Sequence, residues 1–204
     1  MAIIGCSYLK YAKYAYSQGV VSYSDGGTAA KLVNLNLSLD TATDNDFYAD
    51  NAIDETDNVF AGGTITLRTN DLTDAVSKVI LGLAELALSD GEAITGNTDS
   101  GVKEIIYDNT QLVPYLGIGM VIKHKRNGVD AWTGIVLQKV QFAVPPDAAE
   151  TQGKTISWQT PELTGKIFRD DTGSQCWKKQ ATWTTEAQAI NYVNTRLNIT
   201  EPPK

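Results

Sequence analysis

Within residues 31–40 of this 204-residue chain, positions 33–40 alternate strictly between apolar and polar side chains. A side-chain period of two predicts a β-strand with one buried face and one face in solvent. The apolar set is Val33, Leu35, Leu37 and Leu39, and the polar set is Asn34, Asn36, Ser38 and Asp40. Residues 64–69 repeat the pattern, with Ile65 and Leu67 on the apolar face and Thr64, Thr66 and Arg68 on the polar one. Two half-buried strands with mild polar faces are therefore expected.

Other regions also have the signals of β-strands. Residues 116–122 alternate up to an Asn127-Gly128 pair and residues 132–144 return from it, which is the strongest hairpin signal in the chain. Residues 154–160 and 163–169 predict two more strands. The tyrosine-rich N-terminal segment predicts two short strands joined by a turn at residues 17–19.

Two segments have the signals of helices. Asp71 is the expected N-cap of the first, and Gly82 stands where a left-handed residue would end it. Thr185 and Gln188 form a capping box that predicts a C-terminal helix over residues 186–198. Strands and helices do not alternate as in parallel sheets. The sequence therefore predicts a mainly β protein, a two-sheet antiparallel β-sandwich or barrel with one short helix after the third or fourth strand and a C-terminal helix.

Charge is distributed unevenly along the chain. Residues 32–67 contain no Lys or Arg, whereas seven acidic residues fall within residues 40–57. Such a segment cannot pack as a core, so we expect an extended acidic loop over residues 40–63. The formal net charge of -7 argues against proteins that grip nucleic acid, because phosphate binding needs clustered Lys and Arg. Length and apolar content suffice for one core, and we expect a single domain over residues 1–204.

No residue pattern predicts a catalytic, cofactor or metal site. Cys6 and Cys176 are the only cysteines and lack the spacing of metal ligands, so two free thiols are expected. His124 is the only histidine, and its place between Lys123 and Lys125 is typical of a surface strand. No stretch approaches the ~18 apolar residues of a membrane span, so a protein that is soluble when made is expected.

A calcium site in the acidic segment has partial support from spacing. Asp44, Asp46, Asp50 and Glu55 occupy positions 1, 3, 7 and 12 of an EF-hand loop. However, Tyr48 stands at the ligand position 5, and Ala49 stands where the sharp turn needs glycine. Strands are expected on both sides in place of helices. The pattern therefore favours a solvated or partner-binding loop over a calcium site.

Aromatic residues leave a second class of function open. A carbohydrate-binding β-sandwich that recognises a host surface would stack sugars on exposed tryptophans. The candidates are Trp132, Trp158, Trp177 and Trp183. Core packing is the more common role of tryptophan. A hydrolase would need a cleft that the sequence does not indicate.

Several segments occur in an order that resembles one known family. They are YLKYAKY, LVNLNLSLDTAT leading into FYADN, ETDNVFAGGTITLRTNDLTDAVSKVILG, PYLGIGMVIKHKRNG, and QFAVPPDAAETQGKTISWQTPELTGKIFRDDTG. Together they resemble the major tail proteins of long-tailed phages (siphophages), particularly those of Gram-positive bacteria. The resemblance spans nearly the whole chain, except that residues 83–110 do not align.

The resemblance implies a structural virion protein without enzymatic activity or cofactor. Copies of such a tail tube subunit form hexameric rings that stack around a tape measure protein, join tail terminator and tail-tip proteins, and later conduct DNA without binding it specifically. The implied location is the phage tail, after assembly in the host bacterial cytoplasm, with no membrane contact. A tail terminator or head-tail joining ring protein of related fold is the nearest alternative.

The resemblance also suggests roles for two groups of residues. The acidic segment would contact the adjacent ring, with candidates Asp44, Asp46, Phe47, Tyr48, Asp50, Asp54, Glu55 and Asp57. The polar strand faces would line the lumen, with candidates Asn34, Asn36, Ser38, Asp40, Thr64 and Thr66. Uncharged and acidic side chains would let DNA slide, since basic ones hold it by counterion release.

Overall fold

The computed structural model describes residues 2–41, 46–49, 52–56, 59–87, 103–109, 111–146, 151 and 160–200. Eight strands form one large sheet: β1 (Ala2–Ser17), β2 (Val20–Ala30), β3 (Leu32–Thr41), β6 (Phe60–Thr69), β9 (Leu116–Arg126), β10 (Val129–Phe142), β11 (Glu162–Phe168) and β12 (Lys178–Trp183). Two small hairpins are β4 (Asp46–Ala49) with β5 (Ala52–Thr56), and β7 (Ala84–Ala87) with β8 (Lys103–Ile106). The helices are α1 (Asp74–Leu81) and α2 (Glu186–Arg196).

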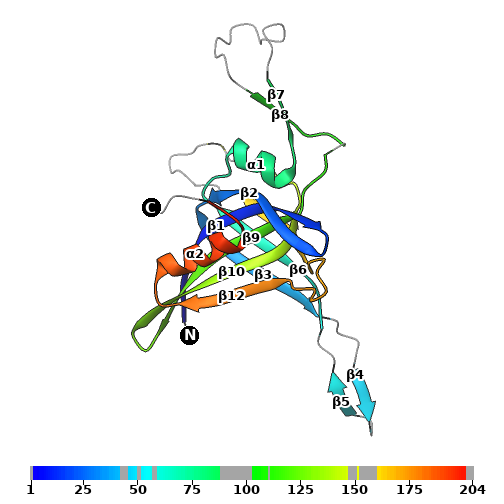
Figure 1. Ribbon diagram of the computed structural model, residues 1–204, viewed down its shortest axis with the longest axis vertical. Coiled ribbons are helices and arrows are strands. Elements are labelled where there is room, and N and C mark those ends of the chain that lie inside the picture. The colour runs from blue at the N-terminus through cyan, green and yellow to red at the C-terminus, as the bar shows by residue number, and fades with distance from the viewer. Residues whose placement is uncertain are drawn as a thin grey trace.

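The large sheet is antiparallel and curls around its own core (Figure 1). Its strand order is β2-β1-β9-β10-β11-β6-β3, and β12 pairs with β10 beside β11. A single residue, Lys31, separates the two end strands β2 and β3 in sequence. The predicted mainly β sandwich or barrel is confirmed, and its two layers are joined into one sheet through β10 and β11. The short helix follows β6, the fourth strand of this sheet along the chain.

The main core lies between the two layers. Leu9, Ile118 and Leu137 reach it from β1, β9 and β10, whereas Ile65 and Leu163 reach it from β6 and β11. All five are at most 1% exposed. At about 1.5–3 kcal/mol for each fully buried aliphatic side chain, this cluster is the main favourable term in folding. Helix α1 adds Ile80 and Leu81 to the same cluster.

A second core lies on the other face of β1, β9 and β10, where α2 packs. Val193 of α2 and its C-cap residue Leu197 lie against Val121 and Val136. The helix approaches closely because the strands beneath it carry glycines. A Cβ built on Gly119 would lie 2.3 Å from the Cγ1 of Val193. This face of the sheet is therefore covered by a helix, and the opposite layer supplies the exposed sheet face.

The predicted helix boundaries need small corrections. The N-cap of α1 is Thr73 and not Asp71, because the Thr73 carbonyl accepts the first bonds, from Val76 and Ser77. Gly82 ends the helix as predicted, with φ 67° and ψ 35°. The predicted N-cap of α2 is confirmed, since the Thr185 side chain accepts from the backbone N–H of Gln188. The Gln188 side chain accepts from the Thr185 hydroxyl, which differs from the reciprocal backbone bond of a capping box. This helix ends at Arg196 rather than at residue 198.

The expected acidic loop over residues 40–63 is wrong as a loop. Strand β3 continues to Thr41, β6 begins at Phe60, and β4 and β5 pair between them. Backbone pairing organises this segment where side-chain burial cannot. The chain leaves α1 at Gly82 and begins β7 at Ala84. Figure 1 shows the β4–β5 and β7–β8 hairpins outside the sheet body, at opposite ends of its long axis.

Some of the strands predicted from the sequence are found in the structure. The hairpin at Asn127-Gly128 and the strand expected at residues 163–169 are confirmed as β9–β10 and β11. Strand β12 was not predicted, and the strand expected at 154–160 falls almost wholly outside the described residues.

Neither α1 nor α2, the helices in the described residues, has the length and apolar character to cross a membrane.

Candidate functional site

The six lumen candidates share one exposed sheet face. Asn36 lies directly opposite Thr66, and Ser38 lies opposite Thr64. Directly opposed residues in neighbouring strands point to the same face. Asn34 lies two residues before Asn36 on β3, and Asp40 lies two residues after Ser38, so both point to the same face. The structure therefore brings together the residues that the sequence placed on two separate strands. We call this surface the polar face.

Strand β11 extends the polar face with residues that the sequence patterns did not single out. Thr164 lies opposite Thr66, and Lys166 lies opposite Thr64. Glu162 lies opposite Arg68, and its Oε2 is 2.7 Å from the Arg68 Nε. The lumen prediction assumed a face without cations. The structure shows that Arg68 and Lys166 both lie on this face. Its charges balance, because Asp40 and Glu162 oppose Arg68 and Lys166.

An open groove of about 680 Å³ lies at one end of the polar face. It forms where β11 leaves β6, since Ile167 opposite Gly63 is the last pair between these strands. Asp40, Lys166 and Arg169 are among its lining residues. The Arg169 guanidinium donates to the carbonyl of Phe60, which β11 no longer reaches. Lys139 also lines the groove, so three basic side chains and one acidic side chain face it.

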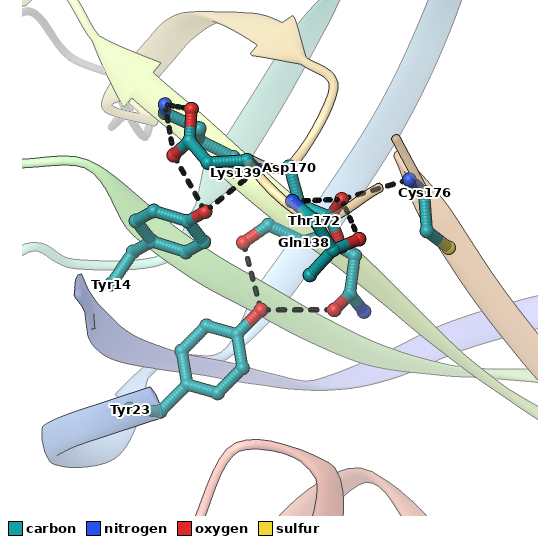
Figure 2. A network of polar contacts seen from close by, with 8 residues as sticks. Tyr14, Tyr23, Gln138, Lys139, Asp170, Thr172 and Cys176 are labelled. Carbon is teal, nitrogen blue, oxygen red and sulfur yellow. Dashed lines mark hydrogen bonds and ion pairs between the residues drawn. The ribbon is translucent and has the colours of Figure 1, made fainter. Parts of the chain in front are cut away.

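A polar network joins β1, β10 and the turn after β11 (Figure 2). The Tyr14 hydroxyl donates to the Asp171 carboxylate at 2.7 Å and accepts from the Asp171 backbone N–H at 3.1 Å. Lys139 Nζ lies 2.7 Å from the same carboxylate. Hydrogen bonds from Lys139 and Tyr14 hold the pKa of Asp171 below its ordinary value. Burial is the main cause that raises the pKa of Tyr14 to about 12.

Buried parts of the same network hold the turn and β2 in place. Asp170 is buried, and its carboxylate accepts from the backbone N–H groups of Thr172 and Cys176. The Tyr23 hydroxyl donates to the backbone carbonyl of Gln138 at 2.9 Å (Figure 2). Burial raises the pKa of the Tyr23 hydroxyl. These bonds tie β1, β2 and the turn after β11 to β10.

The acidic candidates fall partly on the β4–β5 hairpin. Asp46, Phe47 and Tyr48 belong to β4, and Asp54 and Glu55 belong to β5. Asp44, Asp50 and Asp57 lie outside the described residues. The hairpin pairs Asp46 with Thr56, which is a different backbone arrangement from a helix-flanked calcium loop. In the described ranges no three His, Cys, Asp or Glu side chains are grouped to hold a metal ion.

The tryptophans have separate environments. Trp132 and Trp183 are cross-strand neighbours on β10 and β12, and the Trp183 ring lies 6.2 Å from that of Tyr192. Trp177 stacks on Phe60 with ring centroids 4.5 Å apart. Trp158 lies outside the described residues. Trp183, at 36% exposure, is the exposed member of the pair that a sugar could reach.

His124 is half-buried rather than on the open surface, and its Nδ1 is buried with no hydrogen-bond partner among the described residues. His124 pairs across the sheet with Ala131 and Ile3 near the β9–β10 turn. Lys123 beside it forms an ion pair with Asp130 at 2.8 Å. Cys6 and Cys176 are both free thiols.

Comparisons with known proteins do not extend these observations. No protein family model matches the chain, and a search of curated proteins finds no match either.

Proposed function

We propose that this chain is the major tail tube subunit of a long-tailed phage, which self-assembles into stacked hexameric rings around a tape measure protein. The observation that carries the proposal is the polar face. It is a continuous exposed sheet surface of Asn, Ser and Thr side chains with balanced charges, opposite the layer that α2 covers. A ring that turns this face inward presents it to the lumen.

The chemistry of the polar face suits passage of DNA. Duplex DNA carries one negative charge per about 1.7 Å, and a wall of Lys and Arg would retain it by releasing counterions. Here Glu162 pairs with Arg68, so this cation is already neutralised. Screening limits charge effects to roughly 10 Å, so the lining residues dominate. The face therefore offers hydrogen bonds and little net charge, and DNA passes without specific binding.

The β4–β5 hairpin suits contact with the next ring. It extends beyond the sheet body (Figure 1) and carries acidic and aromatic residues in a segment with no basic ones. A hairpin of two short strands is marginal alone in water, so contact with another copy would stabilise it. In this role Asp46, Tyr48 and Glu55 would touch the neighbouring ring, and terminator and tail-tip proteins would occupy the ends of the stack.

The first test is electron microscopy of the purified protein at two salt concentrations. Uniform hollow tubes or six-membered rings are the expected result. Rings that never grow into tubes would favour a terminator or head-tail joining protein. Cryo-EM density that places Asn36 and Thr66 outside the tube would overturn the assignment of the lumen.

A deletion tests the hairpin. Removing residues 43–58 should leave a folded subunit that no longer polymerises, because the large sheet does not depend on this segment for pairing. A control variant with Asp46→Asn, Asp54→Asn and Glu55→Gln retains the segment's length and removes charge alone. Tubes formed by the deletion variant would show that the hairpin is dispensable.

One observation favours a second candidate, a carbohydrate-binding β-sandwich. Trp132 and Trp183 lie side by side, and Tyr192 extends the aromatic surface. Aromatic faces flanked by polar groups are suited to stacking on sugars. A glycan array that shows binding lost with Trp183→Ala, together with the absence of rings and tubes, would place this function first.

A further inference from the structure

The large sheet divides along β10. The C-terminal part of β10, at residues 139–142, pairs with β11, whereas residues 132–137 pair with β12. Residues 132–137 of β10 also pair with β9, on the side away from β12. The first residues of β1 pair in turn with β9. The sheet therefore has a local four-stranded end, β1-β9-β10-β12, below α2. We call it the four-stranded end.

Both outer edges of the four-stranded end lack a strand partner in the described part of the chain. Strand β2 pairs with β1 only from Leu9 onward, so residues 2–7 of β1 have β9 on one side alone. Strand β12 pairs only with β10. Ile3 and Ile4 on the first edge are 68% and 54% exposed. Open edges with exposed apolar side chains are templates for pairing with another chain.

The register across the four strands shows which side chains share a face. Cys6 lies opposite Ile122, Ile122 lies opposite Thr133, and Thr133 lies opposite Thr182. These four residues form one row from edge to edge, on one face of the sheet. Gln180 belongs to the same face because it is two residues from Thr182 on β12.

Strand direction decides how a second copy can add. Each strand of the four-stranded end is antiparallel to its neighbour, so β1 and β12 run in opposite directions. A copy in the same orientation, placed beside β12, therefore presents its β1 antiparallel to that β12. A head-to-tail contact of this kind closes into a ring when the rotation between copies divides the circle.

We propose that residues 2–7 of β1 in one copy pair with β12 of the next copy, so that the ring is sealed through the layer covered by α2. This inference rests on the proposed tail tube function and names the seam between its subunits. The polar face of β3, β6 and β11 remains free to face the lumen. The partner is a second copy because one chain carries both edges, matched in direction. Residues 2–7 of β1 present five ladder positions, because Ile4 is a bulge, and β12 has six residues.

Apolar side chains at the two edges support the seam. Ile3 and Ile4 flank one edge and Trp183 ends the other. A single six-residue strand pair is smaller than the ≈1,000 Å² expected of a stable interface. Each seam is therefore weak alone. In a closed ring every subunit has two seams, and together they stabilise the assembly. A foreign strand on one edge would block both closure and growth.

Native Cys6 allows a direct test by disulfide formation. The starting variant is Cys176→Ser, which leaves Cys6 as the only thiol. Thr182→Cys is then added, with Gln180→Cys as a second variant for a register shifted by two residues. Opposed residues across an antiparallel pair have Cβ atoms about 4.5–5.5 Å apart, close enough for small movements to form the bond. Burial raises the pKa of the Cys6 thiol, so oxidation is carried out at alkaline pH.

Head-to-tail pairing predicts a ladder on non-reducing gels. Each copy donates one thiol at β1 and one at β12, so covalent dimers, trimers and higher multiples should replace most of the monomer. The Cys176→Ser parent, with Cys6 alone, should stay monomeric. A control with Thr164→Cys on the polar face in the same parent should also give no ladder.

Other outcomes separate the seam from the proposed function. Covalent dimers from the Cys6-only parent would show that two β1 edges meet in a two-fold contact, which overturns the seam. Tubes seen by microscopy without a ladder from either β12 variant would also overturn it and leave the tail tube function intact. A ladder from a protein that forms only rings would support the seam and count against a tube-forming subunit.

Discussion

The close approach of α2 to the sheet gives a sharp prediction about Gly119. Substituting Gly119→Ala places a Cβ 2.3 Å from Val193 Cγ1 and 2.9 Å from Leu197 Cδ1, where only about 3.5–4.0 Å is comfortable. Both neighbours are buried side chains on one helix, so the helix must shift. Overpacking of this kind costs about 1–3 kcal/mol. For a chain of this length, that lowers the midpoint of thermal unfolding by about 2–12 °C.

A compensating substitution makes the prediction specific. Val193→Ala alone removes two buried methyl groups and should cost about 2 kcal/mol. Added to Gly119→Ala, it also removes the 2.3 Å contact and leaves only the 2.9 Å contact with Leu197, so the double variant should be more stable than the sum of the two changes by about 1–2 kcal/mol. Gly5→Ala is the control, because its Cβ would meet nothing within 4 Å.

Chemical denaturation followed by tryptophan fluorescence measures these free energies of unfolding. The subunit must be diluted until it is monomeric, because assembly would add concentration-dependent stability. A Gly119→Ala variant within 0.5 kcal/mol of the parent, or a double variant whose effect is the simple sum, would refute close packing of α2 on the glycine-bearing strands.

Three further predictions concern the polar network. Tyr23→Phe leaves the buried Gln138 carbonyl without its hydroxyl donor and should cost about 1–3 kcal/mol in denaturant unfolding, whereas no loss would mean that this bond is absent. Asp171 has a lowered pKa, so its contribution to stability is present above the ordinary value of 3.8 and is lost as pH falls through the lower folded value. The fall in stability below pH 4 should be shallower in Asp171→Asn, and an unchanged profile would contradict the pairing with Lys139. Tyr14, with a pKa of about 12, should ionise above an exposed tyrosine in ultraviolet titration, and Tyr14→Phe should reduce the amplitude of the late ionisation by one tyrosine while buried Tyr23 still ionises late.

Local patterns predicted much of the fold because they record burial and turn chemistry directly. The alternation in β3 and β6 predicted two strands with one face on the core, which is confirmed for Leu35, Leu37, Ile65 and Leu67 and wrong for the exposed Val33 and Leu39. The Asn127-Gly128 pair marked the β9–β10 hairpin. The N-cap of α2 was visible because both partners lie within one turn. The sequence pattern places the N-cap of α1 at Asp71, two residues too early, because Asp is also a favourable N-cap residue. Only the backbone hydrogen bonds to the Thr73 carbonyl show that Thr73 is the N-cap.

The pattern failed where pairing, rather than burial, creates structure. The acidic segment has no apolar face to reveal a strand, yet β4 and β5 pair within it. Strand β12 has few apolar residues because it lies at an edge of the sheet, so its sequence gave no strong signal. Lys166 was absent from the predicted polar face because its neighbours there come from β6, about a hundred residues away in sequence.

The order of amino acids is enough to show which residues alternate, where the chain turns, and that the protein carries net negative charge with a mild polar strand surface. These are properties of neighbouring residues and of composition. The tertiary structure alone decided that β3, β6 and β11 share one face, that α2 closes over Gly119 and Gly134, and that β1 and β12 are left as open edges. Each of those features depends on which distant strands become neighbours, and strand order is set by packing of the whole core rather than by any local run of residues.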